Sequence, residues 1–233
     1  NKYLLPNNPA NNTYTVGGGS AKGVVDEVKV YKGTLLTQTD IDALVLENAN
    51  KDSAYDLAVS NYEGNLPTFS SLDLEENFVD SNGDTTPTTE IQNGRIMSGI
   101  YVDAQRSNGH AQGTFSDDLR PLDTRQRFSF SAYYRFEDAA NGNTLHPFST
   151  WNSSRGWDIY LSKVNDTTAR IVIRQDGTSH FADTGNSVTT TMGQFHHIAF
   201  TSYNGELKIY HDGVEVYSNS NKYLLPNNPT NNI

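Results

Sequence analysis

The segment 195–217 most strongly limits the folds that are open to this chain. Ile198 and Phe200 alternate with smaller or polar residues, and an alternation of period two predicts a half-buried strand. Asn204-Gly205 and Asp212-Gly213 follow at intervals that suit tight turns, because these residues tolerate positive φ. The segment therefore predicts a three-stranded antiparallel meander.

Other segments carry the same kind of pattern. Apolar side chains occupy one face of the run from Phe128 to Phe136, and shorter strands are expected at 157–161, 169–174 and 23–31. Thr37, with Asp40 three residues later, predicts the start of a short helix. Many short strands separated by turns indicate an all-β sandwich or jelly roll.

A duplicated segment indicates how such domains are arranged. Residues 1–12 (NKYLLPNNPANN) reappear as residues 221–232 (NKYLLPNNPTNN), and only Ala10 and Thr230 differ. Chance does not explain this identity, so the chain resembles one period of a tandem array, as in an extracellular fibre or stalk. We expect one copy to pair with a neighbouring molecule as an added strand. The residues assigned to this assembly role are Tyr3, Leu4, Leu5, Tyr223, Leu224 and Leu225.

Composition excludes several classes of function. The chain has 233 residues, no cysteine and a formal net charge of -10. Thiolate metal sites and cysteine nucleophiles are therefore excluded, and the acidic balance disfavours nucleic acid. No apolar run is long enough for membrane insertion. The composition is typical of a secreted or cell-surface all-β protein.

Several of these segments together resemble the concanavalin A-like laminin G family. FSFSAYYRF (128–136) is similar to a characteristic strand of the family, and GQFHHIAFTSYNGELKIYHDGVEV (193–216) to its central meander, with Phe195 in place of the usual Trp. KGVVDEVKVYKGTLLTQTDIDAL (22–44) resembles the closing strand and helix. LDLEENFVDSNGD (72–84) resembles the opening strand and its loop. The resemblance implies an antiparallel jelly-roll β-sandwich with one short helix.

The order of these segments departs from the family. The strand that closes the family's domain stands near the start of this chain, so the chain is permuted. We therefore divide it into residues 1–48, which close a laminin G-like unit, a linker or edge strand at 49–68, and the main body at 69–233. Residues 1–48 complete either their own domain or that of a preceding repeat.

The resemblance also implies a calcium site. Asp26 is expected on the same strand face as Val24, Val28 and Val30, where a carboxylate needs a donor or a cation. The loop Asp80-Ser-Asn-Gly-Asp84 offers the oxygen ligands that suit Ca²⁺. The predicted ligands are Asp26, Asp80, Asn82 and Asp84. The alternative is a hydrogen-bonded turn without a metal.

A sugar site is the second candidate. Trp151 beside Asn152 and Arg155 joins an aromatic ring to hydrogen-bonding groups, as a glycan-binding loop requires. The alternative is that Trp151 fills the end of the sandwich, whereas Trp157 is expected in the core. His196 and His197 are adjacent, so on a strand they face opposite ways and cannot share a metal.

Catalysis is not expected. Asp73 and Glu75 share a strand face, but Ser71 stands where laminarinase-like hydrolases, which share the general fold, have their first carboxylate. The leading hypothesis is a non-enzymatic structural or adhesive repeat that assembles end to end with copies of itself. A calcium-assisted, glycan-binding module is the alternative, and a laminarinase-like hydrolase is the third.

Overall fold

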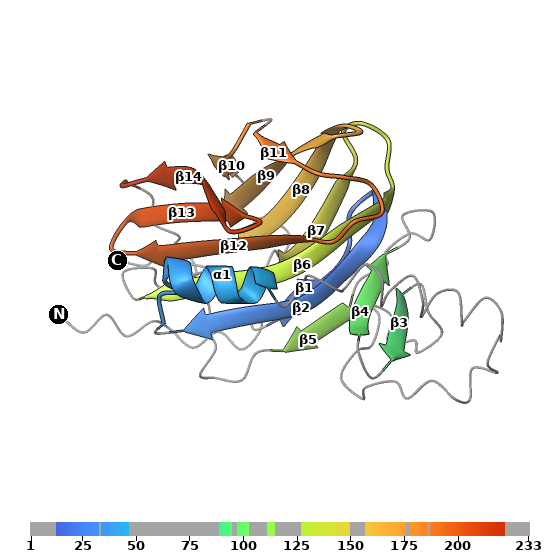
Figure 1. Ribbon diagram of the computed structural model, residues 1–233, viewed down its shortest axis with the longest axis horizontal. Coiled ribbons are helices and arrows are strands. Elements are labelled where there is room, and N and C mark those ends of the chain that lie inside the picture. The colour runs from blue at the N-terminus through green and yellow to red at the C-terminus, as the bar shows by residue number, and fades with distance from the viewer. Residues whose placement is uncertain are drawn as a thin grey trace, which may run out of the picture.

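The computed structural model describes residues 13–32, 34–46, 89–94, 97–102, 111–114, 127–149, 157–175, 178–185 and 187–221. They form two antiparallel sheets packed face to face, with one short helix on the outside of the second sheet (Figure 1). The expected all-β jelly-roll sandwich is thus confirmed. Within these ranges no helix is long and apolar enough to cross a membrane.

The first sheet, called sheet A, has the strand order β10-β9-β8-β7-β1-β5, and β11 pairs with β9. Its strands are β1 (Thr13–Val16), β5 (Ala111–Thr114), β7 (Thr144–Ser149), β8 (Trp157–Asn165), β9 (Thr168–Gln175), β10 (Thr178–Asp183) and β11 (Val188–Thr189).

The second sheet, sheet B, has the order β14-β13-β12-β6-β2-β4-β3. Its strands are β2 (Lys22–Lys32), β3 (Thr89–Gly94), β4 (Met97–Val102), β6 (Phe128–Asp138), β12 (His196–Tyr203), β13 (Glu206–His211) and β14 (Val214–Asn219).

Aromatic side chains fill the space between the sheets. Phe130 and Phe200 stack with ring centroids 5.5 Å apart, and Trp157 meets Phe128 edge to face at 5.8 Å. All four are almost fully buried, and burial of such a side chain contributes about 1.5–3 kcal/mol. Trp157 lies in the core, as its alternation with Ile159 predicted.

The predicted meander forms as β12, β13 and β14. Ile198 stands opposite His211, and the register continues without a shift to Tyr203 opposite Glu206. Asn204 and Asp212 both have positive φ, of 49° and 47°, and each is followed by a glycine that also has positive φ. The two turns therefore have the left-handed residues that a tight hairpin needs.

The helix α1 (Gln38–Leu46) begins at the predicted cap. Asp40 Oδ2 accepts hydrogen bonds from the backbone N–H of Thr37 at 2.8 Å and from its hydroxyl at 2.7 Å. Ile41 and Leu44 bury the inner side of the helix against Ala199 on the outer face of sheet B. The helix thereby covers part of the face that points away from the main core.

The N-terminal strands occupy interior positions in both sheets. β2 lies between β6 and β4, and β1 lies between β7 and β5. A loop that contains Gly17, Gly18 and Gly19 joins them, and all three glycines have positive φ. β1 and β2 thus pair with strands of the same chain, while the proposed linker 49–68 lies outside the described residues.

Candidate functional site

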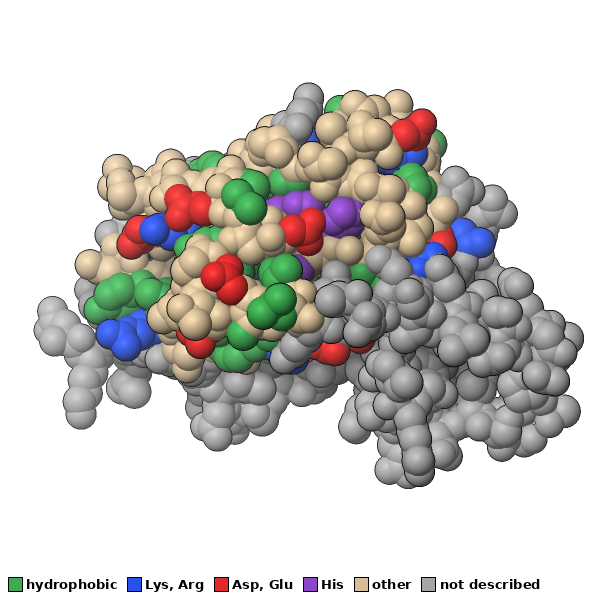
Figure 2. Space-filling model, viewed as in Figure 1, with side chains coloured by type: hydrophobic (Ala, Val, Ile, Leu, Met, Phe, Trp, Pro, Cys, Tyr) green, Lys and Arg blue, Asp and Glu red, His purple; other side chains and the backbone are tan. Residues whose placement is uncertain are grey.

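One polar cluster lies where β12 meets the turn between β13 and β14. We call His196, His211 and Asp212, with their partner Tyr134, the His–Asp cluster. The register set by the Asn204-Gly205 turn places Asp212 beside His197, whose carbonyl accepts the Asp212 N–H at 2.9 Å. Figure 2 shows histidine and acidic side chains close together on the face that carries α1. The meander alone therefore assembles most of the cluster.

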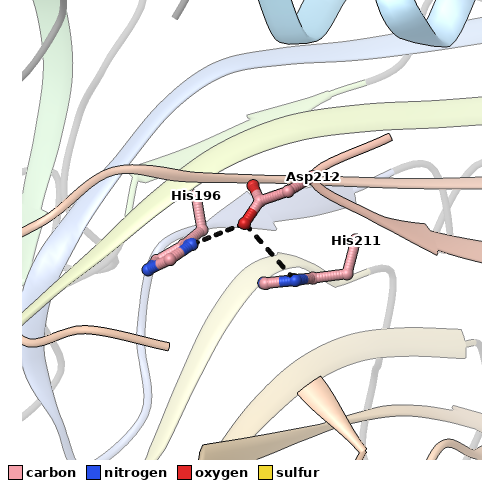
Figure 3. Close-up of side chains that lie close together, drawn as sticks. All are labelled: His196, His211 and Asp212. Atoms are coloured by element: carbon pink, nitrogen blue, oxygen red, sulfur yellow. Dashed lines mark hydrogen bonds and ion pairs between the residues drawn. The ribbon is translucent and has the colours of Figure 1, made fainter. Parts of the chain in front are cut away.

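Both histidines point their Nδ1 atoms at the same carboxylate oxygen (Figure 3). His196 Nδ1 lies 2.7 Å from Asp212 Oδ2, and His211 Nδ1 lies 3.5 Å from it. The other oxygen, Oδ1, accepts the backbone N–H of His197 at 2.7 Å. The two rings stack at 5.2 Å, so the carboxylate joins β12, β13 and the turn.

The far nitrogens of both rings have partners as well. The backbone N–H of Thr191 donates to His196 Nε2 at 2.9 Å. This nitrogen therefore carries no proton, and the single proton of the neutral ring is on Nδ1, facing Asp212. His211 Nε2 lies 2.8 Å from the hydroxyl of Tyr134, which is fully buried on β6.

The local electrostatics favour a neutral His211 beside an ionised Asp212. Burial lowers the pKa of His211 to about 4, because the charged ring would lose its hydration. Burial alone would raise the pKa of Asp212, but the hydrogen bond from His196, the nearby His211 and the amide of His197 together lower it. Burial raises the pKa of Tyr134, so its hydroxyl stays protonated.

The cluster is poorly suited to a metal ion. The ligand atoms of His196, His211 and Asp212 lie within 4.8 Å of one another. A neutral imidazole that binds a metal through Nδ1 carries its proton on Nε2. On His196 that proton would face the N–H of Thr191, so one donor would oppose another. The geometry fits a closed hydrogen-bond network that locks the meander, and neither His196 nor His211 presents an unoccupied nitrogen to a substrate.

A second cluster lies on the outer face of sheet A. Asp158 is 1 % exposed, its Oδ1 lies 3.3 Å from His146 Nδ1, and it forms an ion pair with Arg174. The ring of Tyr160 stacks on His146 at 5.2 Å, and the Arg174 guanidinium lies 5.8 Å from its centroid. We call these four residues the Tyr160 patch. It joins a half-buried aromatic ring to charged groups on one face of the sheet.

Asp26, the predicted calcium ligand, lies on a different face from the one expected. It stands opposite Tyr133, and the register of β2 against β6 shifts between Asp26 and Lys29. Glu27 has φ of 45° within this shift, as a bulge residue often does. The expectation that Asp26 shares a face with Val28 and Val30 is therefore wrong, since these two valines pack on the main core.

Asp26 is buried beside the register shift in β2. Its side chain is 3 % exposed, and its Oδ1 accepts the N–H of Glu27 at 2.7 Å. The other predicted calcium ligands, Asp80, Asn82 and Asp84, lie outside the described residues, so the calcium site stays a prediction.

The remaining predicted site residues also lie outside the described ranges. They are Trp151, Asn152 and Arg155 of the sugar-binding loop and Tyr3, Leu4, Leu5, Tyr223, Leu224 and Leu225 of the duplicated segment. The carboxylates Asp73 and Glu75, which are not expected to be catalytic, lie outside these ranges too. These assignments stay predictions.

The sequence analysis missed His211 and Asp212, although a signal was present. Once Asn204-Gly205 is taken as the turn, the hairpin register places the His211-Asp212 pair opposite Ile198 and His197. The prediction that His196 and His197 face opposite ways is confirmed, because His196 stands opposite Tyr134 and His197 opposite Tyr133. His197 Nε2 lies 2.9 Å from the hydroxyl of Ser131 on the outer face.

Comparison with known proteins agrees with this architecture. A laminin G-like family model, described as the concanavalin A-like lectin/glucanases superfamily, matches residues 107–233, which is more than half of the chain. No curated protein and no solved structure gave a match. The matched region contains the meander and β6, which are two of the four segments that carried the sequence resemblance. The chain therefore belongs to the concanavalin A-like lectin/glucanase superfamily as a laminin G-like protein.

Proposed function

We propose that this chain is a non-enzymatic structural or adhesive module of an extracellular repeat array, and that its units join end to end. The observation that carries the proposal is the duplicated segment, which precedes β1 as residues 1–12 and follows β14 as residues 221–232. A segment in both places links the last strand of one unit to the first strand of the next. The extracellular location agrees with the laminin G-like family, whose domains are typically extracellular.

The geometry of the sandwich supports this role. β1 and β2 lie in the interior of sheets A and B, so a unit that starts at β1 and ends at β14 is a closed sandwich. Such a unit needs only a connector to its neighbour. The connector contains Tyr223, Leu224 and Leu225, which are apolar enough to pack at the joint between two units.

A two-unit protein tests the proposal. Residues 1–220 would be followed by a complete second copy, so that one duplicated segment lies at the joint. We expect small-angle scattering and negative-stain microscopy to show two beads at one fixed spacing and orientation. A broad distribution of spacings, as for a flexible tether, would contradict an architectural role.

A matched pair of variants identifies the contribution of the connector. Leu224→Ser with Leu225→Ser at the joint is expected to loosen the spacing, because these apolar side chains would lose their packing. Asn227→Ser with Asn228→Ser alters the same connector without removing apolar area, and is expected to leave the spacing unchanged. Equal behaviour of both variants would count against packing by Leu224 and Leu225.

Glycan binding is the second candidate, and the Tyr160 patch favours it. Ser149 and Asp158 stand opposite each other at one end of β7 and β8, so the connection that contains Trp151, Asn152 and Arg155 leaves from the edge of this patch. Aromatic rings beside charged and amide groups are the usual composition of a sugar-binding surface. In this proposal Asp26, Asp80, Asn82 and Asp84 hold a Ca²⁺ ion that stabilises the module.

Binding measurements against a glycan panel test this candidate. Binding that is lost in Trp151→Ala and Tyr160→Ala, and on addition of a chelator, supports it. Tyr203→Ala is the matched control, because Tyr203 is an exposed aromatic residue at the end of β12 in the other sheet. Absence of binding to every glycan in the panel would remove the candidate and leave the structural role in place.

A further inference from the structure

The N-terminal unit, comprising β1, β2 and α1 (residues 13–46), fills a slot in the interior of the sandwich. β2 separates β6 from β4, and β1 separates β7 from β5. Val16, Ala21 and Val25 of this unit are buried in the main core. Without the unit, β6 and β7 would each present an unpaired edge, which readily pairs with another strand.

Backbone pairing and packing hold the unit in the slot. Gly19 is so close to β7 that an added Cβ would lie 2.0 Å from the carbonyl oxygen of Thr144. The backbone N–H groups of Ser20 and Ala21 donate to this same oxygen at 2.8 and 2.9 Å. On the outer face, Gln38 Nε2 donates to the carbonyl of Gly213 at 2.7 Å.

These contacts do not depend on which chain supplies the unit. Residues 47–88 lead from α1 to β3, and a connection of that length can span more than roughly 100 Å. A second copy of the chain would offer the same strands in the same register. A chain can hold its own N-terminal unit or that of a second copy. The free energies of these two forms differ mainly in the entropy of loop closure and of association, and the entropy of loop closure changes slowly with loop length.

The duplicated segment supplies a second route to the slot. In sheet B, β13, β12 and β6 lie between β14 and β2, which corresponds to roughly 20 Å across the sheet. A segment as long as residues 221–232 spans up to roughly 40 Å when extended. An N-terminal unit attached after that segment therefore reaches the slot of the preceding domain as readily as its own.

We propose that the slot accepts the N-terminal unit of a second copy of this chain, so that neighbouring copies exchange β1, β2 and α1. The inference rests on the proposed array function and deepens it by naming the exchanged element and its partner. Two units joined in this way would share both sheets. The joint would then be as strong as the fold itself.

Cysteine pairs across the slot test the exchange, because the chain contains no cysteine of its own. Thr15 and Gln112 stand opposite each other where β1 pairs with β5. One full-length chain would carry Thr15→Cys and a second would carry Gln112→Cys. The two would be unfolded together, refolded over a range of concentrations, oxidised and separated by mass without reductant.

Exchange predicts a Thr15–Gln112 disulfide dimer whose yield rises with concentration and exceeds the control several-fold. The control pairs Thr15→Cys with Tyr203→Cys, since Tyr203 lies on the other sheet. The double variant Thr15→Cys/Gln112→Cys in one chain must form its internal disulfide, which shows that the geometry permits the bond and that the chain folds. No mixed dimer above the control, with the internal disulfide intact, would overturn the exchange. A fixed spacing in the two-unit protein would then still support the array function.

Discussion

The backbone N–H of Thr191 donates a hydrogen bond of 2.9 Å to Nε2 of His196, and this contact determines what the His–Asp cluster can do. It fixes the ring proton on Nδ1, where Asp212 accepts it at 2.7 Å. A ring held in this way lacks the free lone pair that a metal ligand or a general base needs. The cluster therefore has the properties of a structural clamp on β12.

Zinc is expected to leave the stability of the protein unchanged. Binding through Nδ1 of His196 and His211 would break the Thr191 hydrogen bond, a loss of about 0.5–1.5 kcal/mol. Thermal unfolding with excess Zn²⁺ and with a chelator would be compared. Equal midpoints of thermal unfolding are expected. A midpoint that rises when zinc is added, and that no longer rises in Asp212→Asn, would contradict the assignment of the cluster as a structural clamp.

Acid is expected to destabilise the fold between pH 6.5 and pH 4. Burial lowers the pKa of both His197 and His211 from 6.5 to about 4, so the unfolded chain takes up protons in this range while the folded chain does not. The free energy of unfolding is then highest above pH 6.5 and falls as the pH drops, by up to about 3 kcal/mol for each histidine. Urea unfolding at a series of pH values measures this slope.

His211→Gln provides the control for the acid transition. Glutamine does not titrate, and its side-chain amide can still reach the hydroxyl of Tyr134. We expect a shallower dependence on pH than in the parent protein, although stability at neutral pH will also be lower. An unchanged slope would mean that His211 does not take part in the transition.

The fold was largely predictable because alternation and turn residues are local signals. β6 and the meander follow from side chains two residues apart, and Asn204-Gly205 sets a register that the structure retains. The face of Asp26 was not predictable. β2 contains one extra residue between Asp26 and Lys29, where Glu27 has positive φ, and no glycine or asparagine in that stretch signals a bulge. One inserted residue exchanges the two faces of a strand.

The candidate site was less predictable than the fold, because its contacts join residues that the local pattern does not relate. The hairpin register implies that Asp212 lies beside His197. The contact of His211 with Tyr134 requires that β6 and β12 be neighbours. The contact of His196 with Thr191 depends on the path of the loop before β12. Neither relationship has a signal in the spacing of residues.

Asp212→Asn is expected to destabilise the protein by about 1–3 kcal/mol at neutral pH. Asparagine tolerates the φ of 47° and retains an oxygen for the N–H of His197, so the loss reports mainly the acceptor that faces His196, which an amide donor replaces. Asp212→Ala should cost more, since it removes both acceptors and strains the turn. Chemical denaturation measures both variants, and equal losses would show that the backbone conformation dominates.

Gly19→Ala is expected to weaken the attachment of the N-terminal strands to β7. The added Cβ would lie 2.0 Å from the carbonyl oxygen of Thr144, and Gly19 has φ of 104°. The backbone must therefore move, and we expect a loss of about 3 kcal/mol or more in the free energy of unfolding. Gly142→Ala is the matched control, because Gly142 has φ of 87° but no atom within 4 Å of the added Cβ. The control should lose only about 1–2 kcal/mol to backbone strain, and an equal loss in both variants would show that the contact with Thr144 is not tight.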